Sequence, residues 1–544
     1  MSSNQTNNSF LKQGSILALT SIVVRLIGMI YRIPLTNIIG DEGNGIYSPA
    51  FELYSLLLIL SSNAMPMAVS KMVSEKMAVK KYKESQRVFS VAYIFSMCTG
   101  GAAALILFFF ADWIEKNLYT KYTGISIPLK ILAPTIFVVA MMGVLRGFFE
   151  GNKTMIPTAF SQLVEQIVNA IVSVVAAFYF VNLHSASKNV SAWGAAGGTL
   201  GTCIGAVAGF IILLLILLLF MPMYKRKLSH DKRKNIMSKS DTVKLVFLTV
   251  TPIILSQTVY QISGTLDTII FSKCMDLRGY TDFAVKTLQG IYSTKYRLLV
   301  NVPIAISTSI ASSMIPSLVR AYIKHEKTTV KSCVNLAVKF NMIIAIPSAV
   351  GLSVLGEPII RLLFRGSDYK IAGQMLLYGS ICIIFYALST VTSGILQGIN
   401  KMTVPVFNAA ISLVIHVVLV TVLLLFTPLG AFSLVIGNVT YPIVVCILNA
   451  FSVKKYLGIS QELKTTFIIP FVVSIVMGII TFGIYFILFK LTKILVVSVL
   501  VSIFIGITVY FVGVLRFKAL SKAELYEFPF GRTIYAFAVK IRIM

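Results

Sequence analysis

The stretch Arg146-Gly-Phe-Phe-Glu-Gly-Asn-Lys-Thr-Met-Ile-Pro157 is a short polar interruption between two long apolar segments. A related stretch, Ser393-Gly-Ile-Leu-Gln-Gly-Ile-Asn-Lys-Met-Thr-Val-Pro405, recurs with one inserted residue at a period of about 248 residues. A second match, Gly45-Ile-Tyr-Ser48 with Gly290-Ile-Tyr-Ser293, recurs at a period of about 245 residues. Two matches at nearly one period indicate an internal duplication.

The repeated stretch combines glycines with a following proline in both copies. Glycine permits a tight turn and close approach of helices, and proline is tolerated where a helix begins because its missing N–H costs nothing there. The pattern therefore predicts a conformational hinge in each half. Its residues are Gly147, Gly151, Pro157, Gly394, Gly398 and Pro405.

The composition is that of a membrane protein. Of the 544 residues, 57% are hydrophobic and only 12% are charged. Apolar runs of roughly 20 residues, the length that crosses about 30 Å of hydrocarbon, recur along the chain. The net charge of +28 comes from basic residues that flank these runs, which indicates contact with anionic lipid and argues against nucleic acid.

The apolar runs predict fourteen membrane-spanning helices, and the first is expected to be retained because no small-residue cleavage site follows it. The predicted ranges are 12–37, 46–78, 85–111, 125–148, 156–182, 192–222, 242–272, 285–316, 329–354, 371–396, 403–426, 430–452, 465–489 and 493–515. Basic residues concentrate in the connections after even-numbered helices. The positive-inside rule then places these connections and both termini in the cytoplasm.

The duplication divides the chain. We expect an N-terminal six-helix lobe over 1–222, a basic cytoplasmic linker over 223–241, and a C-terminal six-helix lobe over 242–452. Two additional helices (465–515) and a basic cytoplasmic tail (516–544) follow. Because each repeat has an even number of helices, both enter the membrane from the same side. Parallel repeats of this kind place a substrate site between the two halves of a transporter.

Several ionisable or polar residues interrupt the apolar helices along single helix faces. Such residues are costly inside a membrane, about 2.5–3.5 kcal/mol each, and usually face a cavity. The predicted substrate-binding residues of a central cavity are Arg25, Arg32, Glu52, Glu165, Lys295, Arg297 and Asn301. Four cations against two carboxylates predict a positive cavity that suits a phosphate or pyrophosphate, which arginine binds through two parallel hydrogen bonds.

Structural alternatives exist for most of these residues. Arg32 and Glu52 lie near predicted helix ends and could reach the interface, while Lys295 could point away from Arg297. Glu165 could contact substrate or serve as the counter-ion of Arg25. His416, alone on an apolar helix, is expected to be a buried histidine with a hydrogen-bond partner.

Motifs for catalysis, metals and nucleotides are absent from the sequence. It has no Walker A motif, no H-E-x-x-H, no C-x-x-C and no G-x-S-x-G, and its six cysteines are scattered. We therefore expect no metal site, no cofactor, no disulfides and no enzymatic activity. Transport would draw on an ion gradient, the membrane potential or a partner.

Three motifs carry a resemblance to a known family. They are Arg146-Gly-Phe-Phe-Glu-Gly151 with Met155-Ile-Pro-Thr-Ala159, Ser161-Gln-Leu-Val-Glu-Gln166, and Val24-Arg-Leu-Ile-Gly-Met-Ile-Tyr-Arg-Ile-Pro34. The chain resembles the polysaccharide-biosynthesis flippases of the multidrug/oligosaccharidyl-lipid/polysaccharide (MOP) exporter superfamily. Within it, the similarity is to the branch of stage V sporulation protein B and the Gram-positive lipid II flippases.

The resemblance implies an all-α, V-shaped, two-lobed transporter that moves undecaprenyl-pyrophosphate-linked sugars outward by alternating access. It implies that Arg25, Arg32 and Arg297 line a cationic cavity and that the last two helices form a groove for the lipid tail. Glu52 stands where the Gram-negative lipid II flippases have a basic residue, so their contacts on this helix do not carry over.

The predicted function is a lipid II flippase for peptidoglycan synthesis and cell shape, in the bacterial plasma membrane. Alternatives are a flippase for another lipid-linked polysaccharide and a cation-coupled multidrug exporter, which would offer carboxylates to its substrates. A non-transporting scaffold has no reason to bury aligned charges. Expected partners are the lipid-linked sugar, membrane lipids and the cell-wall synthesis machinery, with the protein a monomer.

Overall fold

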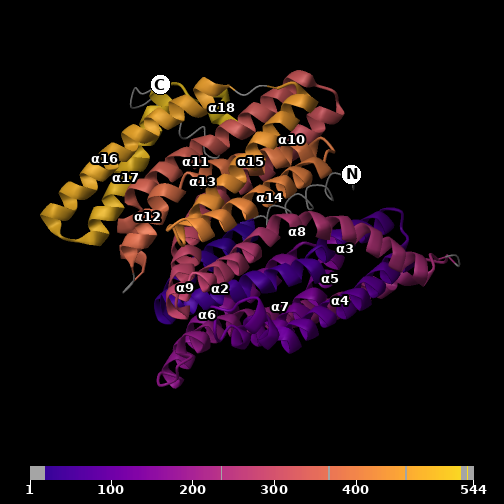
Figure 1. The fold of residues 1–544 in the computed structure, drawn as a ribbon. Helices are drawn as coiled ribbons and strands as arrows, with labels where there is room; N and C mark the ends of the chain where they lie inside the picture. Colours follow the sequence, from indigo (N-terminus) through magenta and orange to yellow (C-terminus); the bar gives the residue numbers. More distant parts are fainter. Residues whose placement is uncertain are drawn as a thin grey trace. The chain divides into compact units, whose positions relative to one another are not determined.

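Helices make up most of the part of the chain that the structure, a computed structural model, describes: residues 17, 19–233, 236–364, 368–459, 462–527 and 536. The chain divides into two compact units, Met1–Gly290 (unit 1) and Ile291–Met544 (unit 2). Figure 1 shows the helices of each unit along the chain. Most of the predicted basic tail 516–544, including everything beyond Glu527 except residue 536, lies outside the described residues, as does the start of the first predicted helix.

Unit 1 contains the first seven predicted helices and the start of the eighth. A helix over 19–30 leads into the labelled elements. These are α2 (Arg32–Leu58), the π-helix η1 (Ile59–Asn63), α3 (Met65–Ala78), α4 (Tyr82–Asn117), α5 (Ser126–Gly151), α6 (Ile156–Leu183), α7 (Val190–Ser229), α8 (Lys239–Leu277) and α9 (Asp282–Gly290).

Unit 2 contains the remaining elements. They are the π-helix η2 (Ile291–Tyr296), α10 (Arg297–Ile323), α11 (Lys327–Leu363), α12 (Tyr369–Gly379), α13 (Cys382–Gly398), α14 (Thr403–Phe426), α15 (Phe432–Leu457), the π-helix η3 (Lys464–Ile468), α16 (Ile469–Thr492), α17 (Leu495–Arg516) and α18 (Lys522–Glu527).

The number of helices agrees with the fourteen predicted spans. Among the described residues, twelve helices are long and apolar enough to cross a membrane, and the pair α12 and α13, bent by 49°, adds a thirteenth. One of the twelve, Leu19–Ala78, holds 60 residues and both of the first two predicted helices. They meet at Gly40, whose φ of 68° and ψ of −179° break the helix in a conformation that essentially only glycine adopts.

The compact units divide within the predicted eighth helix, between α9 and η2, rather than at the predicted linker 223–241. The reason is packing: α8 contacts α2 and α4, and α9 packs closely on α2. The division of the chain into lobes at 223–241 therefore stays a prediction about evolutionary repeats.

The duplicated turn has the same backbone in both copies. Asn152, Lys153 and Thr154 donate their N–H groups to Phe148, Glu150 and Phe149. Ile399, Asn400 and Lys401 make the equivalent three bonds to Ile395, Gln397 and Leu396. The left-handed residue is Lys153 (φ 61°) in the first copy and Asn400 (φ 62°) in the second. Lys153 thus corresponds to Asn400, and the inserted residue falls after this turn.

The core of unit 1 gathers around the predicted hinge. Phe148, Phe149 and Tyr224 are fully buried in a cluster that also includes Met65 and Val69 of α3. A Cβ on Gly147 would lie 2.6 Å from the carbonyl oxygen of Pro66, so α5 approaches the backbone of α3 directly. Small residues at such crossings are what allow helices to pack closely in membranes.

The last two long helices form a pair beside α11. Figure 1 shows α16 and α17 running next to each other. Val473 and Met477 of α16 and Tyr510 and Val514 of α17 share a buried cluster with Phe340 of α11. The Tyr510 hydroxyl donates to the Ile343 carbonyl over 2.9 Å, which fixes α17 on α11.

Candidate functional site

The two arginines of the first predicted helix lie in unit 1 and differ in their surroundings. Arg25 is exposed, and among the described residues no side chain bonds or pairs with it. Arg32 is half-buried, with its guanidinium carbon 5.8 Å from the centre of the Phe51 ring, a distance at which a cation is attracted to an aromatic face. An exposed arginine within an apolar span needs water or an anion to stabilise its charge.

Glu52 is held within unit 1 by a neighbouring helix. The Thr268 hydroxyl donates to Glu52 Oε2 over 2.8 Å, and this contact joins α2 to α8. Gln289 Nε2 in turn donates to the Thr268 hydroxyl over 3.4 Å. Glu52 is therefore part of a hydrogen-bonded chain between helices, and its predicted contact with substrate stays a prediction.

Glu165 pairs with a residue that the sequence analysis did not select. Arg146 Nη2 lies 2.6 Å from Glu165 Oε2, and the two side chains are 14% and 28% exposed. Arg146 Nε also donates to the Ser161 hydroxyl over 3.2 Å. The ion pair that the structure shows for Glu165 is thus with Arg146, where the sequence suggested Arg25. Arg146 and Glu165 both lie in the motifs that carry the family resemblance, and this shared location was the sequence signal that could have indicated the pair.

The second repeat replaces that ion pair by neutral groups. Ser393 occupies the position before Gly394, as Arg146 does before Gly147. Asn449 Nδ2 donates to the Ser393 hydroxyl over 3.0 Å, and Asn408 Nδ2 donates to Asn449 Oδ1 over 2.9 Å. The two halves therefore use different chemistry at one position of the fold.

Lys295, Arg297 and Asn301 lie close together in sequence but not on one face. Lys295 is 1% exposed within η2. Arg297 is half-buried, with its guanidinium carbon 6.0 Å from the Tyr292 ring centre, and Asn301, one turn further along α10, is exposed. A buried ammonium group needs partners inside the protein, so burial favours a structural role for Lys295. Arg297 and Asn301 share a helix face.

His416 behaves as predicted. It is 2% exposed, and its Nδ1 lies 3.0 Å from the Gly437 carbonyl oxygen. Its ring also meets that of Tyr441 at 5.7 Å, edge to face. The histidine is a buried packing residue of unit 2.

The duplicated Gly-Ile-Tyr-Ser motif forms a crossing that the sequence analysis did not foresee. A Cβ on Gly45 would lie 1.8 Å from the Lys286 carbonyl oxygen, and one on Gly290 would lie 1.9 Å from that of Asp41. Gly45 therefore contacts the residue four positions before Gly290, and Gly290 contacts the residue four positions before Gly45. Lys286 Nζ also lies 3.3 Å from Glu42 Oε1. The two copies of one motif thus hold α2 against α9.

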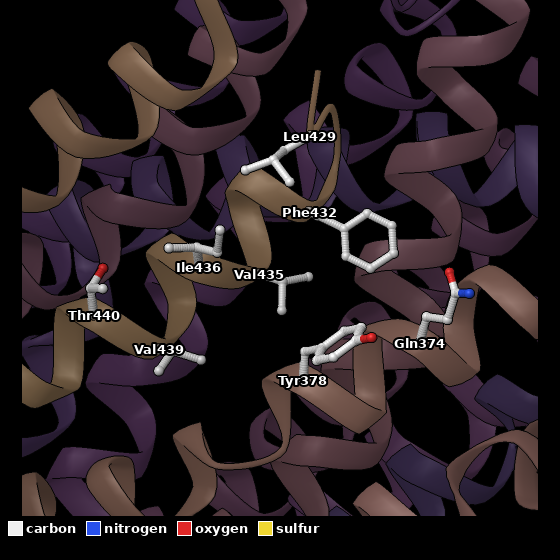
Figure 2. Close-up of a pocket in the computed structure, with 8 residues that line it drawn as sticks. All are labelled: Gln374, Tyr378, Leu429, Phe432, Val435, Ile436, Val439 and Thr440. Atoms are coloured by element: carbon white, nitrogen blue, oxygen red, sulfur yellow. The ribbon is translucent and has the colours of Figure 1, made fainter. Parts of the chain in front are cut away.

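A pocket of about 550 Å³ lies in unit 2 between α12 and α15. Figure 2 shows its lining, in which Phe432, Val435, Ile436 and Val439 supply apolar surface. Polar groups come only from Gln374, Tyr378 and Thr440 among the eight residues that line it. None of the predicted site residues lies in this pocket.

Solved structures of transporters share this fold. A structure described as lipid II flippase MurJ in an inward closed conformation covers 92% of this chain and 98% of its own, with a TM-score of 0.67 and 19% identity. An inward-facing multidrug resistance MATE family transporter of the MOP superfamily covers 80% and 95%, with a TM-score of 0.62 and 12% identity. These matches show the fold: the described helices have the all-α, multi-spanning architecture seen in those transporter structures.

Comparison of sequences gives the family. The polysaccharide biosynthesis protein profile matches residues 10–322 and the MatE profile matches 252–422. The chain therefore belongs to the polysaccharide biosynthesis protein family. It is 27% identical to the lipid II flippase MurJ of Bacillus subtilis over 493 residues, which is 87% of this chain and 88% of that protein. It is 24% identical to stage V sporulation protein B of Bacillus subtilis over 538 residues, which is 97% and 99%.

Proposed function

We propose that the protein is a flippase that moves lipid II, the undecaprenyl-pyrophosphate-linked peptidoglycan precursor, to the outer leaflet of the bacterial plasma membrane. The observation that carries this proposal is the similarity to a lipid II flippase over 87% of the chain. In the proposed arrangement both termini are cytoplasmic and the protein acts as a monomer. Its product would supply the cell-wall synthesis machinery and so support cell shape.

The proposed substrate contacts are made by arginines. Arg25 is exposed on an apolar helix, and Arg32 and Arg297 are each half-buried beside an aromatic ring. A guanidinium donates two parallel hydrogen bonds to phosphate oxygens and keeps its charge at any physiological pH. Glu165 and Glu52 are engaged by Arg146 and Thr268, which makes them poorer ligands for a cationic drug. This favours an anionic substrate over multidrug export.

Alternating access would require the crossing of α2 and α9 to open and close. Gly45 and Gly290 bring two helix backbones together there, and the sequence predicts that this end of the helices faces outward. Closing this crossing would shield the substrate from the outside. Separation at the two glycines would then release it. In this proposal Gly147 and Gly394, packed on neighbouring helices, transmit the movement within each repeat.

The membrane potential is the proposed driving force. One charge moved across 100 mV is worth about 2.3 kcal/mol. A potential that is negative inside would draw the empty, cationic site toward the cytoplasm and would oppose the outward movement of the neutralised, loaded site only weakly. We propose further that α16 and α17 hold the lipid tail, because both expose long apolar faces that include Ile479, Phe486 and Phe504.

A second candidate is transport of another lipid-linked polysaccharide precursor. It is favoured by the match to stage V sporulation protein B, which extends over 97% of the chain. Expression of the protein in a strain depleted of its own lipid II flippase distinguishes the two. The first proposal predicts that the protein restores growth. It also predicts that Arg25→Ala, expressed at the same level, does not. Failure to restore growth, together with rescue of a strain lacking a capsule or teichoic-acid flippase, would support the second candidate instead.

A further inference from the structure

A second cationic site lies at one end of unit 1, and neither Arg25 nor Arg32 lines it. It is a pocket of about 610 Å³, within the range of about 300–1,000 Å³ that small-molecule sites occupy. The α3–α4 turn, the end of α7 and the segment after α7 form its walls. Its lining contains a single carboxylate, Asp231, and the uncharged residues Tyr82, Met223 and His230. The lining also contains five basic residues: Lys80, Arg226, Lys227, Lys232 and Arg233.

Two of these residues build the wall of the pocket. Asp231 is 6% exposed, and its carboxylate accepts the backbone N–H groups of Lys83 over 3.1 Å and of Arg233 over 3.3 Å. The Arg233 guanidinium donates to the carbonyl oxygens of Val79 over 3.1 Å and Lys80 over 2.8 Å. The carboxylate and one arginine are thus committed to holding the α3–α4 turn against the end of α7.

The other four cations are not used in this framework. In the described part of the chain, no carboxylate pairs with Lys80, Arg226, Lys227 or Lys232, and their side-chain nitrogens donate no hydrogen bond. Several like charges around one pocket repel each other, and a bound anion relieves that repulsion. A phosphate group is suited to the set, because arginine and lysine both bind its oxygens.

The position of the pocket on α7 indicates where such a phosphate would come from. Leu219, Met223, Arg226 and His230 follow each other at helical spacing along one face. Leu219 is 82% exposed and Met223 is 48% exposed. The face therefore passes from apolar surface suited to an acyl chain directly to a cationic pocket, and the sequence predicts that this end of α7 is cytoplasmic. Basic pockets at the cytoplasmic ends of membrane helices bind lipid headgroups.

We propose that this pocket binds the phosphate headgroup of an anionic glycerophospholipid, with an acyl chain lying along the Leu219–Met223 face of α7. The lipid would bridge the α3–α4 turn and the end of α7 and so stabilise this end of unit 1. The site is independent of the transported substrate, and its test does not rely on transport.

The test is thermal unfolding of the purified full-length protein in detergent with added short-chain lipid. We expect dioctanoyl phosphatidylglycerol to raise the midpoint temperature and dioctanoyl phosphatidylcholine to leave it unchanged. In Arg226→Gln/Lys232→Gln, the apparent Kd should rise about 30-fold, since each basic residue near an anionic lipid is worth roughly fivefold. Neither side chain holds the wall of the pocket, so the variant should fold.

A charge-matched control separates the pocket from general surface charge. Lys71→Gln/Lys225→Gln removes two exposed lysines that do not line the pocket, and its Kd should stay within about twofold of the parent value. Equal stabilisation by phosphatidylcholine, or equal weakening in the control, would overturn the proposal. Inorganic phosphate at matched ionic strength supplies the remaining comparison: the same stabilisation by phosphate alone would mean a soluble anion and would overturn the assignment to lipid.

Discussion

Substitution of Gly45 by alanine tests the crossing of α2 and α9. The added Cβ would lie 1.8 Å from the Lys286 carbonyl oxygen, more than an ångström short of van der Waals contact, and a backbone atom cannot move aside as a side chain can. Overpacking of this kind costs about 1–3 kcal/mol, and the helix propensity that alanine adds is the same whether the crossing is open or closed. We therefore expect the closed crossing to lose about 1–3 kcal/mol, roughly 5- to 150-fold in population.

Crosslinking measures the crossing directly. Glu42 and Lys286 are joined across it by an ion pair of 3.3 Å, so Glu42→Cys/Lys286→Cys, in a background lacking the native cysteines, should react readily with a short bifunctional methanethiosulfonate. Adding Gly45→Ala should slow this reaction strongly, as should Gly290→Ala. Gly483→Ala is the control, because no atom lies within 4 Å of its Cβ position. If crosslinking in Gly45→Ala were as fast as in the parent, the crossing would not be under the proposed constraint.

Three further predictions concern stability and lipid contact. Arg146→Met should lower the midpoint of thermal unfolding by several degrees, because Glu165 loses a 2.6 Å ion pair. The loss in free energy of unfolding should be about 2 kcal/mol and should be smaller in Arg146→Met/Glu165→Gln. If the losses of the two single substitutions were additive in the double variant, the coupling would be refuted. Burial raises the pKa of Glu524, but its hydrogen bonds with Lys339 and Ser521 outweigh burial and lower the pKa below the ordinary value. The ionised Glu524 therefore stabilises the fold above the pKa of the unfolded state, and this stabilisation is lost as the pH falls through the pKa of the folded state. The difference in stability between the parent and Glu524→Gln should disappear at acid pH, and a difference independent of pH would contradict this. A photoreactive polyprenyl pyrophosphate should label residues 465–515, and labelling confined to earlier helices would count against a tail groove there.

The fold could be predicted from the sequence because its controlling signals are local. Apolar length set the number of spans, and the duplicated turn reappears with the same three backbone hydrogen bonds in both copies. The turn also fixes the alignment of the two copies. Residue identity alone would pair Lys153 with Lys401, but the left-handed residue and its hydrogen bonds pair Lys153 with Asn400.

The site was less predictable because partners are set by packing between helices. Periodicity placed Glu165 on a polar stripe, but it could not select Arg146 over Arg25 as the partner. It also could not show that Lys295 is buried while Asn301, on the same predicted helix, is exposed. The meeting of Gly45 with Lys286 and of Gly290 with Asp41 depends on two segments far apart in sequence, so no local pattern could reveal it.

Reconstituted transport tests the central claim most directly. The protein is placed in liposomes that carry fluorescent lipid II, and the arrival of the headgroup in the opposite leaflet is followed by an impermeant quencher, with and without a membrane potential. We predict protein-dependent movement of lipid II that is abolished in Arg25→Ala and Arg297→Ala, while both variants insert normally. Movement at the rate of protein-free liposomes, or full activity in both variants, would contradict the account.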